Sequence, residues 1–298
     1  MHTRTLAAGL LLAMSSQAHA NIDIQFDYSY DTAGFFSSNA GSMTALEAAA
    51  AVFETRFADS LWAIDSSGAN NFSAVFFNPS DPFGVDISLA KQDFATDVIR
   101  VYVGGANLAS GTLGLGGAGG YSCSGIATFC ADAASRGQGT VSGATATDFA
   151  LWGGSISFNS AETWHFGTTT TGLDTYEADF YSVAVHELAH VLGFGIADSF
   201  SNLVTGGVFH GATTGPVSLY GDEAHWAEGT MSVVNGVPQE AAMDPTVYIG
   251  DRKRFTDLDY AAMKDIGWDV TPVPEAETWA MMLAGLGLVG FAARRRMS

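Results

Sequence analysis

The alternation of apolar and polar residues predicts strands and helices along much of the chain. Every second position between Ile22 and Tyr30 is apolar, which is the period of a half-buried strand. Residues 97–105 (DVIRVYVGG) and 155–160 (SISFNS) predict two more strands. Residues 42–62 are rich in Ala, Leu and Glu and contain no Gly or Pro, so they predict a helix of about four to five turns.

A segment of small residues, 104–147, interrupts this pattern. Gly, Ala, Ser and Thr dominate it, and it contains the run GTLGLGGAGG at residues 111–120, so a long surface loop is expected there. The chain's two cysteines, Cys123 and Cys130, lie in this segment. Two nearby cysteines in an oxidising compartment predict a disulfide that closes a small loop.

A further helix is predicted over residues 176–192. Asp174 is its expected N-cap, with Glu177 completing a capping-box pattern, and a glycine follows its end. On this helix His186 and His190 lie one turn apart on the same face, so both imidazoles can reach one zinc ion at about 2.0–2.1 Å. Glu187 is rotated by about 100° from His186 and suits a general base beside the ion.

The segment HELAHVLGFG, residues 186–195, resembles the HExxHxxG segment of the metzincin zinc endopeptidases. The compact form of that motif places its third zinc ligand three residues after the first glycine, where this chain has Ile196, which cannot bind zinc. A catalytic zinc needs three protein ligands and one open position. The candidates for the third ligand are Asp198, His210, His225 and a glutamate such as Glu223.

The residues that follow resemble the leishmanolysin-like metzincins, in which the third histidine comes after an insertion of tens of residues. Here His225 precedes a tryptophan, Met243 stands at the position of the methionine turn, and residues 265–268 (DIGW) match the end of the last helix. The resemblance implies His186, His190 and His225 as zinc ligands and Glu187 as catalytic base. His165 is expected in or beside the edge strand that lines the substrate cleft of a metzincin.

Both ends of the chain show processing signals. Residues 1–20 have a basic start, a short apolar run and the small-x-small pattern AHA, which predict a cleaved signal peptide. Residues 271–298 resemble the PEP-CTERM sorting signal, with a Pro-Glu motif, fifteen apolar residues and an arginine cluster. An alanine, Ala276, replaces the usual second proline of that motif. The residues that carry the resemblance are Pro274, Glu275, Arg294, Arg295 and Arg296.

This tail implies recognition by an exosortase-type sorting enzyme and transient association with the inner membrane. The mature protein is then expected at the surface of a Gram-negative bacterium or outside it. Without the four basic and two acidic residues of the two terminal segments, the chain's 12 basic and 31 acidic residues leave a net charge of about −21. Such a surface excludes nucleic acid as a partner and leaves Ca²⁺ as an additional ligand, although no acidic loop specifies a calcium site.

These observations predict an α+β protein with a metzincin-like zinc peptidase domain, built from a twisted mixed sheet, an active-site helix and a C-terminal helical subdomain. The expected divisions are a signal peptide (1–20), a catalytic domain (21–270) with subdomains of about 21–195 and 196–270, and a sorting tail (271–298).

The predicted function is a secreted or cell-surface zinc metalloendopeptidase that hydrolyses protein or peptide substrates through a zinc-activated water, with Glu187 as general base. One alternative is a non-catalytic surface adhesin or matrix protein on the same fold. Glu187 argues against it, because a purely structural zinc has no use for that base. A zinc hydrolase that acts on a non-peptide bond is a second alternative.

Overall fold

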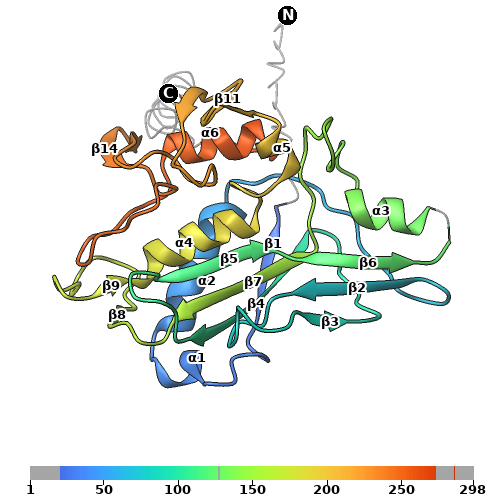
Figure 1. Ribbon diagram of the computed structural model, residues 1–298, viewed down its shortest axis with the longest axis horizontal. Coiled ribbons are helices and arrows are strands. Elements are labelled where there is room, and N and C mark those ends of the chain that lie inside the picture. The colour runs from blue at the N-terminus through green and yellow to red at the C-terminus, as the bar shows by residue number, and fades with distance from the viewer. Residues whose placement is uncertain (1–20, 127, 273–284, 286–298) are drawn as a thin grey trace, which may run out of the picture.

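A four-stranded mixed sheet forms the centre of the protein (Figure 1). The computed structural model describes residues 21–126, 128–272 and 285. The strand order is β1-β4-β7-β5; the first three strands run parallel, and β5 runs antiparallel to β7 at the edge of the sheet. The strands are β1 (Asp23–Asp27), β4 (Val98–Ala106), β7 (Gly153–Asn159) and β5 (Gly114–Ala118).

Both faces of this sheet are buried, each against a different core. Along β4, Ile99, Val101 and Val103 belong to the larger core, whereas Tyr102 belongs to the smaller one on the other face. The larger core includes apolar residues of α2 (Ser42–Glu54) and α4 (Phe180–Val191). Burial on both sides explains why strands β4 and β7 contain continuous runs of buried residues, rather than a polar alternation.

A second sheet of three strands covers part of the other face. Its order is β3-β2-β6, and all its pairs are antiparallel. Residues 104–147 were expected to be loop, but they hold β5, β6 and α3, so that prediction is wrong in part. The strands of the second sheet and the helix that follows β6 are β2 (Asn71–Phe76), β3 (Ile87–Leu89), β6 (Gly120–Ser124) and α3 (Phe129–Ser135).

The two long helices differ from the sequence prediction at one end each. Helix α2 ends at Glu54, not at residue 62, because the following chain is extended and pairs with the C-terminal segment through a bridge between Phe57 and Val270. Helix α4 begins at Phe180 and not at residue 176. Its N-cap is Asp179, whose carboxylate accepts a hydrogen bond from the backbone N–H of Ser182.

The chain after α4 contains short helices and short antiparallel strands, and neighbouring strands pair as hairpins. The last helix begins with a capping box between Thr256 and Asp259 and ends at Asp265, as the sequence predicted for its end. Helix and strand are thus both present throughout, which confirms the α+β class. The elements are α5 (Asp198–Ser201), β10 (Val204–Thr205), β11 (Val208–Gly211), β12 (Gly215–Ser218), β13 (Met231–Val234), β14 (Val237–Glu240) and α6 (Asp257–Asp265).

Three short elements complete the described chain: α1 (Phe35–Ser38), β8 (Trp164–His165) and β9 (Ala178–Asp179). Among the described residues, no helix has both the length and the apolar character needed to cross a membrane. The expected signal peptide (1–20) lies outside the described residues, as do the predicted sorting residues Pro274, Glu275, Arg294, Arg295 and Arg296.

Candidate metal centre

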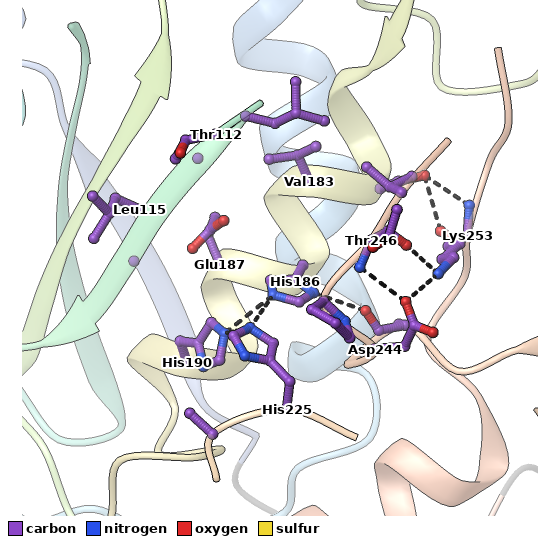
Figure 2. A pocket seen from close by; sticks show the side chains of 18 of the residues that line it. Thr112, Leu115, Val183, His186, Glu187, His190, His225, Asp244, Thr246 and Lys253 are labelled. Carbon is purple, nitrogen blue, oxygen red and sulfur yellow. Dashed lines mark hydrogen bonds and ion pairs between the residues drawn. The ribbon is translucent and has the colours of Figure 1, made fainter. Parts of the chain in front are cut away.

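Three histidines meet beneath the mixed sheet's edge strand (Figure 2). His186 and His190 project from one face of α4, and His225 comes from the loop after β12. The Nε2 atom of His225 lies 3.1 Å from Nε2 of His186 and 3.0 Å from Nε2 of His190, and the latter two are 3.1 Å apart. The structure therefore brings together the two histidines of the motif and one that is 35 residues further along the chain.

The other ring nitrogen of each histidine is held by an oxygen acceptor. Nδ1 of His186 lies 2.8 Å from the carbonyl oxygen of Ala242, and Nδ1 of His190 lies 2.9 Å from that of Phe194. Nδ1 of His225 lies 2.8 Å from Oδ2 of Asp222. Because carbonyl and carboxylate oxygens only accept, each Nδ1 carries the proton and each Nε2 presents a lone pair.

Three lone pairs that face one another repel unless a cation lies between them. Ligands at about 2.0–2.1 Å around a tetrahedral zinc are roughly 3.3 Å apart, close to the observed separations. Burial, with the neighbouring imidazoles, lowers the pKa of His190 to about 4 and the pKa of His186 well below its ordinary value. Both rings are thus neutral at pH 7, as metal ligands must be, and the donor set fits zinc.

Glu187 lies beside the three histidines, on the side of α4 that faces β5 (Figure 2). Its side chain is buried, and burial raises its pKa to about 8, against the lowering effect of a hydrogen bond from the backbone N–H of Gly116. Glu187 is not one of the residues whose donor atoms meet at the histidine cluster. A carboxyl group in this place can exchange a proton with a molecule bound at the histidines without ligating the metal itself.

A cavity of about 450 Å³ opens over this cluster. One wall is the edge strand and the residues before it, 111–116, and the opposite wall is the segment that follows β14. Ile196, at the third-ligand position of the compact motif, also lines the cavity. The residues on the wall opposite to β5 are Ala242, Asp244, Pro245, Thr246, Val247 and Lys253.

Asp259, at the start of α6, binds two segments of this site: the one that carries His225 and the one that contains Ala242. Its carboxylate accepts hydrogen bonds from Nε1 of Trp226 at 2.9 Å and from the backbone N–H of Ala242 at 2.9 Å. Trp226 follows His225 in the chain, and the carbonyl of Ala242 holds His186. Met243, the predicted turn methionine, is fully buried next to Ala242, and its backbone N–H also points to Asp259.

A second cluster of acidic residues lies near the cavity, and the ammonium group of Lys253 lies among its carboxylates. Oxygens of Glu228, Glu240 and Asp244 lie close together, but Nζ of Lys253 forms ion pairs of 2.7 Å with both Glu240 and Asp244. The ammonium also donates to the carbonyl oxygen of Thr246. Lys253 therefore supplies the positive charge that balances these carboxylates, and the cluster does not support the expected calcium ion.

The alternative third ligands lie elsewhere. His210 is exposed on β11, where it pairs with Pro216 of β12, and Asp198 accepts a hydrogen bond from the backbone of Gly143. Glu223 is exposed.

The expectation for His165 is wrong. This residue is buried in β8, its Nε2 bonds to the carbonyl of Thr169, and the strand that lines the cavity is β5. The residues of β5 are rich in glycine, so the sequence pattern predicts a loop there and not the strand that lines the cavity.

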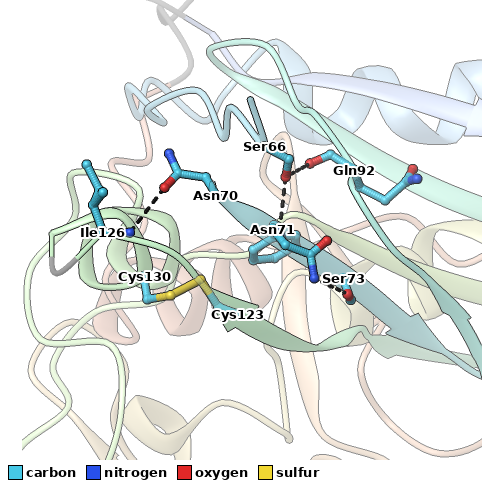
Figure 3. Close-up of a disulfide and its surroundings, with 9 residues drawn as sticks. Ser66, Asn70, Asn71, Ser73, Gln92, Cys123, Ile126 and Cys130 are labelled. Atoms are coloured by element: carbon cyan, nitrogen blue, oxygen red, sulfur yellow. Dashed lines mark hydrogen bonds between the residues drawn. A yellow bond between two sulfur atoms is a disulfide. The ribbon is translucent and has the colours of Figure 1, made fainter. Parts of the chain in front are cut away.

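The predicted disulfide is present (Figure 3), and neither of its cysteines lines the cavity over the histidines. It joins Cys123 at the end of β6 to Cys130 in α3, with 5.7 Å between the Cα atoms. Nearby, the side chain of Asn70 accepts a hydrogen bond from the backbone N–H of Ile126. The bridge thus ties the short helix to the second sheet, and its role is structural.

Sequence reasoning missed two residues that support the site, Asp222 and Asp259. Asp222 stands three residues before His225, and a carboxylate at that distance is the one available signal. Asp259 is visible in the sequence only as the third residue of a capping box.

Two family models match the chain. Residues 132–206 match the Matrixin family, and residues 272–296 match the PEP-CTERM protein-sorting motif. The first match holds His186, Glu187 and His190 but ends before His225. No curated protein and no solved structure matches the chain. The two matches confirm the resemblance to a metzincin with a sorting tail; they support a zinc metallopeptidase that is recognised by an exosortase and exported to the bacterial cell surface.

Proposed function

We propose that this chain is an exported zinc metalloendopeptidase whose zinc ligands are His186, His190 and His225 and whose general base is Glu187. The observation that carries the proposal is the meeting of three unprotonated Nε2 atoms within 3.1 Å, with a buried carboxyl group next to them in an open cavity. A structural zinc site is closed by four protein ligands, whereas three ligands that face a cavity leave one position free for substrate.

When bound, zinc would lower the pKa of a water molecule and polarise the carbonyl group of the scissile peptide. Glu187 accepts the proton of the attacking water and delivers it to the leaving nitrogen. Asp222 and the carbonyl of Ala242 keep their histidines in the ligating tautomer.

The edge strand gives the substrate a place to bind. In the described part of the chain β5 pairs only with β7, so its other edge has no strand partner, and residues 111–116 line the cavity. An extended peptide that adds a strand there would lie across the three histidines with its backbone fixed. Recognition through the backbone is consistent with a peptidase of unfolded or extended segments.

The sorting motif supports the location. An exosortase-type enzyme would remove the tail at the inner membrane of a Gram-negative bacterium, and the catalytic domain would then act at the cell surface or outside the cell. The negative surface charge favours solubility there and disfavours binding to anionic lipid.

Cleavage of casein by the zinc-loaded protein, with Glu187→Ala as the matched control, tests the function. The parent should cleave and the variant should not, although both should hold one zinc ion. Cleavage at an equal rate by both proteins would overturn the mechanism. Failure of both, each with one zinc, would favour the non-catalytic adhesin.

A further inference from the structure

Strand β5 and helix α4 approach each other unusually closely at Glu187. A Cβ atom built on Gly114 would lie 2.7 Å from Oε1 and 2.8 Å from Cγ of Glu187. A Cβ atom on Gly116 would lie 2.5 Å from the carbonyl oxygen of Glu187. Real Cβ atoms essentially never show separations under 3.0 Å, so a side chain at Gly116 would clash with the helix backbone, and one at Gly114 would displace the Glu187 side chain.

The two glycines stand at alternate positions of one strand and therefore face the same side. The intervening residue, Leu115, and the next one, Gly117, face the other side of the sheet. A Cβ atom on Gly117 would meet one atom, Cε1 of Phe77, at an ordinary 3.9 Å. The steric requirement for glycine within β5 is thus confined to the face that contacts Glu187.

No side chain holds the carboxylate of Glu187 among the residues that the structure describes, in which it forms no ion pair and no hydrogen bond to another side chain. Its side chain packs against the backbone of β5 at Gly114. The direction of the carboxylate is therefore set by a strand backbone rather than by a partner residue.

We propose that Gly114 and Gly116 are positioning residues for Glu187: their missing side chains let the backbone of β5 pack directly on Glu187 and fix the place of its carboxyl group beside the histidines. The part of the strand that lines the cavity, residues 114–116, would also bind the substrate through its free edge, so one segment would align both the base and the scissile peptide. This inference rests on the proposed function. It explains why a glycine-rich run occurs in a strand, where glycine is otherwise unfavourable.

Gly114→Ala tests the proposal most directly, because the added methyl group would meet the end of the Glu187 side chain rather than the backbone. We expect kcat to fall about 100-fold, the typical result of a displacement of about 1 Å, with little change in KM or zinc content. Gly117→Ala, in the same strand but outside the cavity lining, should keep the parent kcat. Equal rates for Gly114→Ala and the parent would overturn the proposal.

Cobalt substitution gives a readout that needs no turnover. The visible spectrum of Co²⁺ responds to groups next to its open position, so Gly114→Ala should shift it toward the spectrum of Glu187→Ala, and Gly117→Ala should not. A parent spectrum that Gly114→Ala leaves unchanged would overturn the positioning role alone. A parent that binds no Co²⁺ and no zinc would overturn the proposed function and this inference together.

Gly114→Ala also brings its methyl group near Val183 and can lower the stability of the fold. The same substitution in a Glu187→Ala background separates the two effects. Its cost in free energy of unfolding should be smaller there, because the side chain that it displaces is gone. An equal cost in both backgrounds would show that Gly114 serves helix packing only, against the proposal.

Discussion

The indole of Trp226 donates a hydrogen bond to the buried carboxylate of Asp259, and this bond joins the loop that carries His225 to the first turn of α6. The same carboxylate caps its own helix through Thr256 and accepts the backbone N–H of Ala242. One side chain thus connects three segments that are distant in sequence. Burial raises the pKa of Asp259, and its hydrogen bonds oppose that shift.

Asp259→Asn should therefore destabilise the fold. The amide would place a donor among the donors of Trp226, Ala242 and Thr256, and each buried group left without a partner costs about 1–3 kcal/mol. We expect the free energy of unfolding, measured by urea denaturation, to fall by at least about 2 kcal/mol. Asp257→Asn, exposed in the same helical turn, is the control and should cost little. An equal loss of unfolding free energy in both variants would argue against a stabilising role of the hydrogen bonds around Asp259.

Asp222→Ala should weaken zinc binding, because Asp222 holds Nδ1 of His225. Removal of such a carboxylate partner lowers metal affinity about 10- to 100-fold in other metal sites. Competition with a chromophoric chelator would measure the change. Glu223→Asn is the matched control, since Glu223 is the exposed neighbour and asparagine tolerates its positive φ of 56°. If zinc affinity falls in the Glu223 variant instead, Glu223 is itself a ligand.

Arg136→Lys should lower stability by about 3 kcal/mol. The Arg136 side chain is fully buried and donates to the carbonyls of Trp62, Val98, Leu151 and Ala95. An ammonium group cannot reach four carbonyls in one plane, and a lost hydrogen bond from a charged group costs about 1.5–3 kcal/mol. Arg254→Lys, at an exposed position, should leave the urea midpoint unchanged.

Asp59→Asn should change how stability depends on pH. Burial raises the pKa of Asp59 to about 7, against the hydrogen bond from the backbone of Asp269. In the unfolded chain the group titrates near 3.9, so between about pH 4 and 7 the unfolded state loses the proton that the folded state keeps. This group's contribution to stability is therefore present below pH 4 and declines as pH rises to 7.

The asparagine variant lacks that decline. Its free energy of unfolding relative to the parent should rise by about 3 kcal/mol from pH 4 to pH 7 and level off above about pH 8. Taking the difference between the two proteins cancels the pH dependence of zinc binding, which both share. A difference that is flat across this range would mean that Asp59 is ionised in the folded protein.

The sequence predicted the centre of α4 correctly, because the HExxH spacing is itself a helical pattern. It predicted the wrong start, because the capping pattern of Asp174 and Glu177 forms a turn before the helix. Glu177 does accept the backbone N–H of Asp174, but within a turn, while the helix begins after Asp179. Pairing of β9 with β8 occupies the residues between. A local pattern of hydrogen bonds was real, yet tertiary pairing decided where the helix begins.

Strand β5 could not be predicted, because glycine carries no apolar periodicity. Its place in the sheet comes from pairing with β7, and its close contact with Glu187 is visible only in the folded chain. His225 came from the resemblance, since spacing alone left His210 open. The structure separates the two through the hairpin of β11 and β12, which exposes His210 and returns the chain to α4.

The separation of 35 residues between His190 and His225 has a consequence for the order of events in export. An ion held by all three imidazoles would join segments that are far apart in the sequence, and because the unfolded chain does not hold the three rings together, zinc binding would stabilise the folded state. An exported chain without metal would then unfold more easily than the same chain after loading. Zinc bound after export would therefore keep the protein folded where it acts.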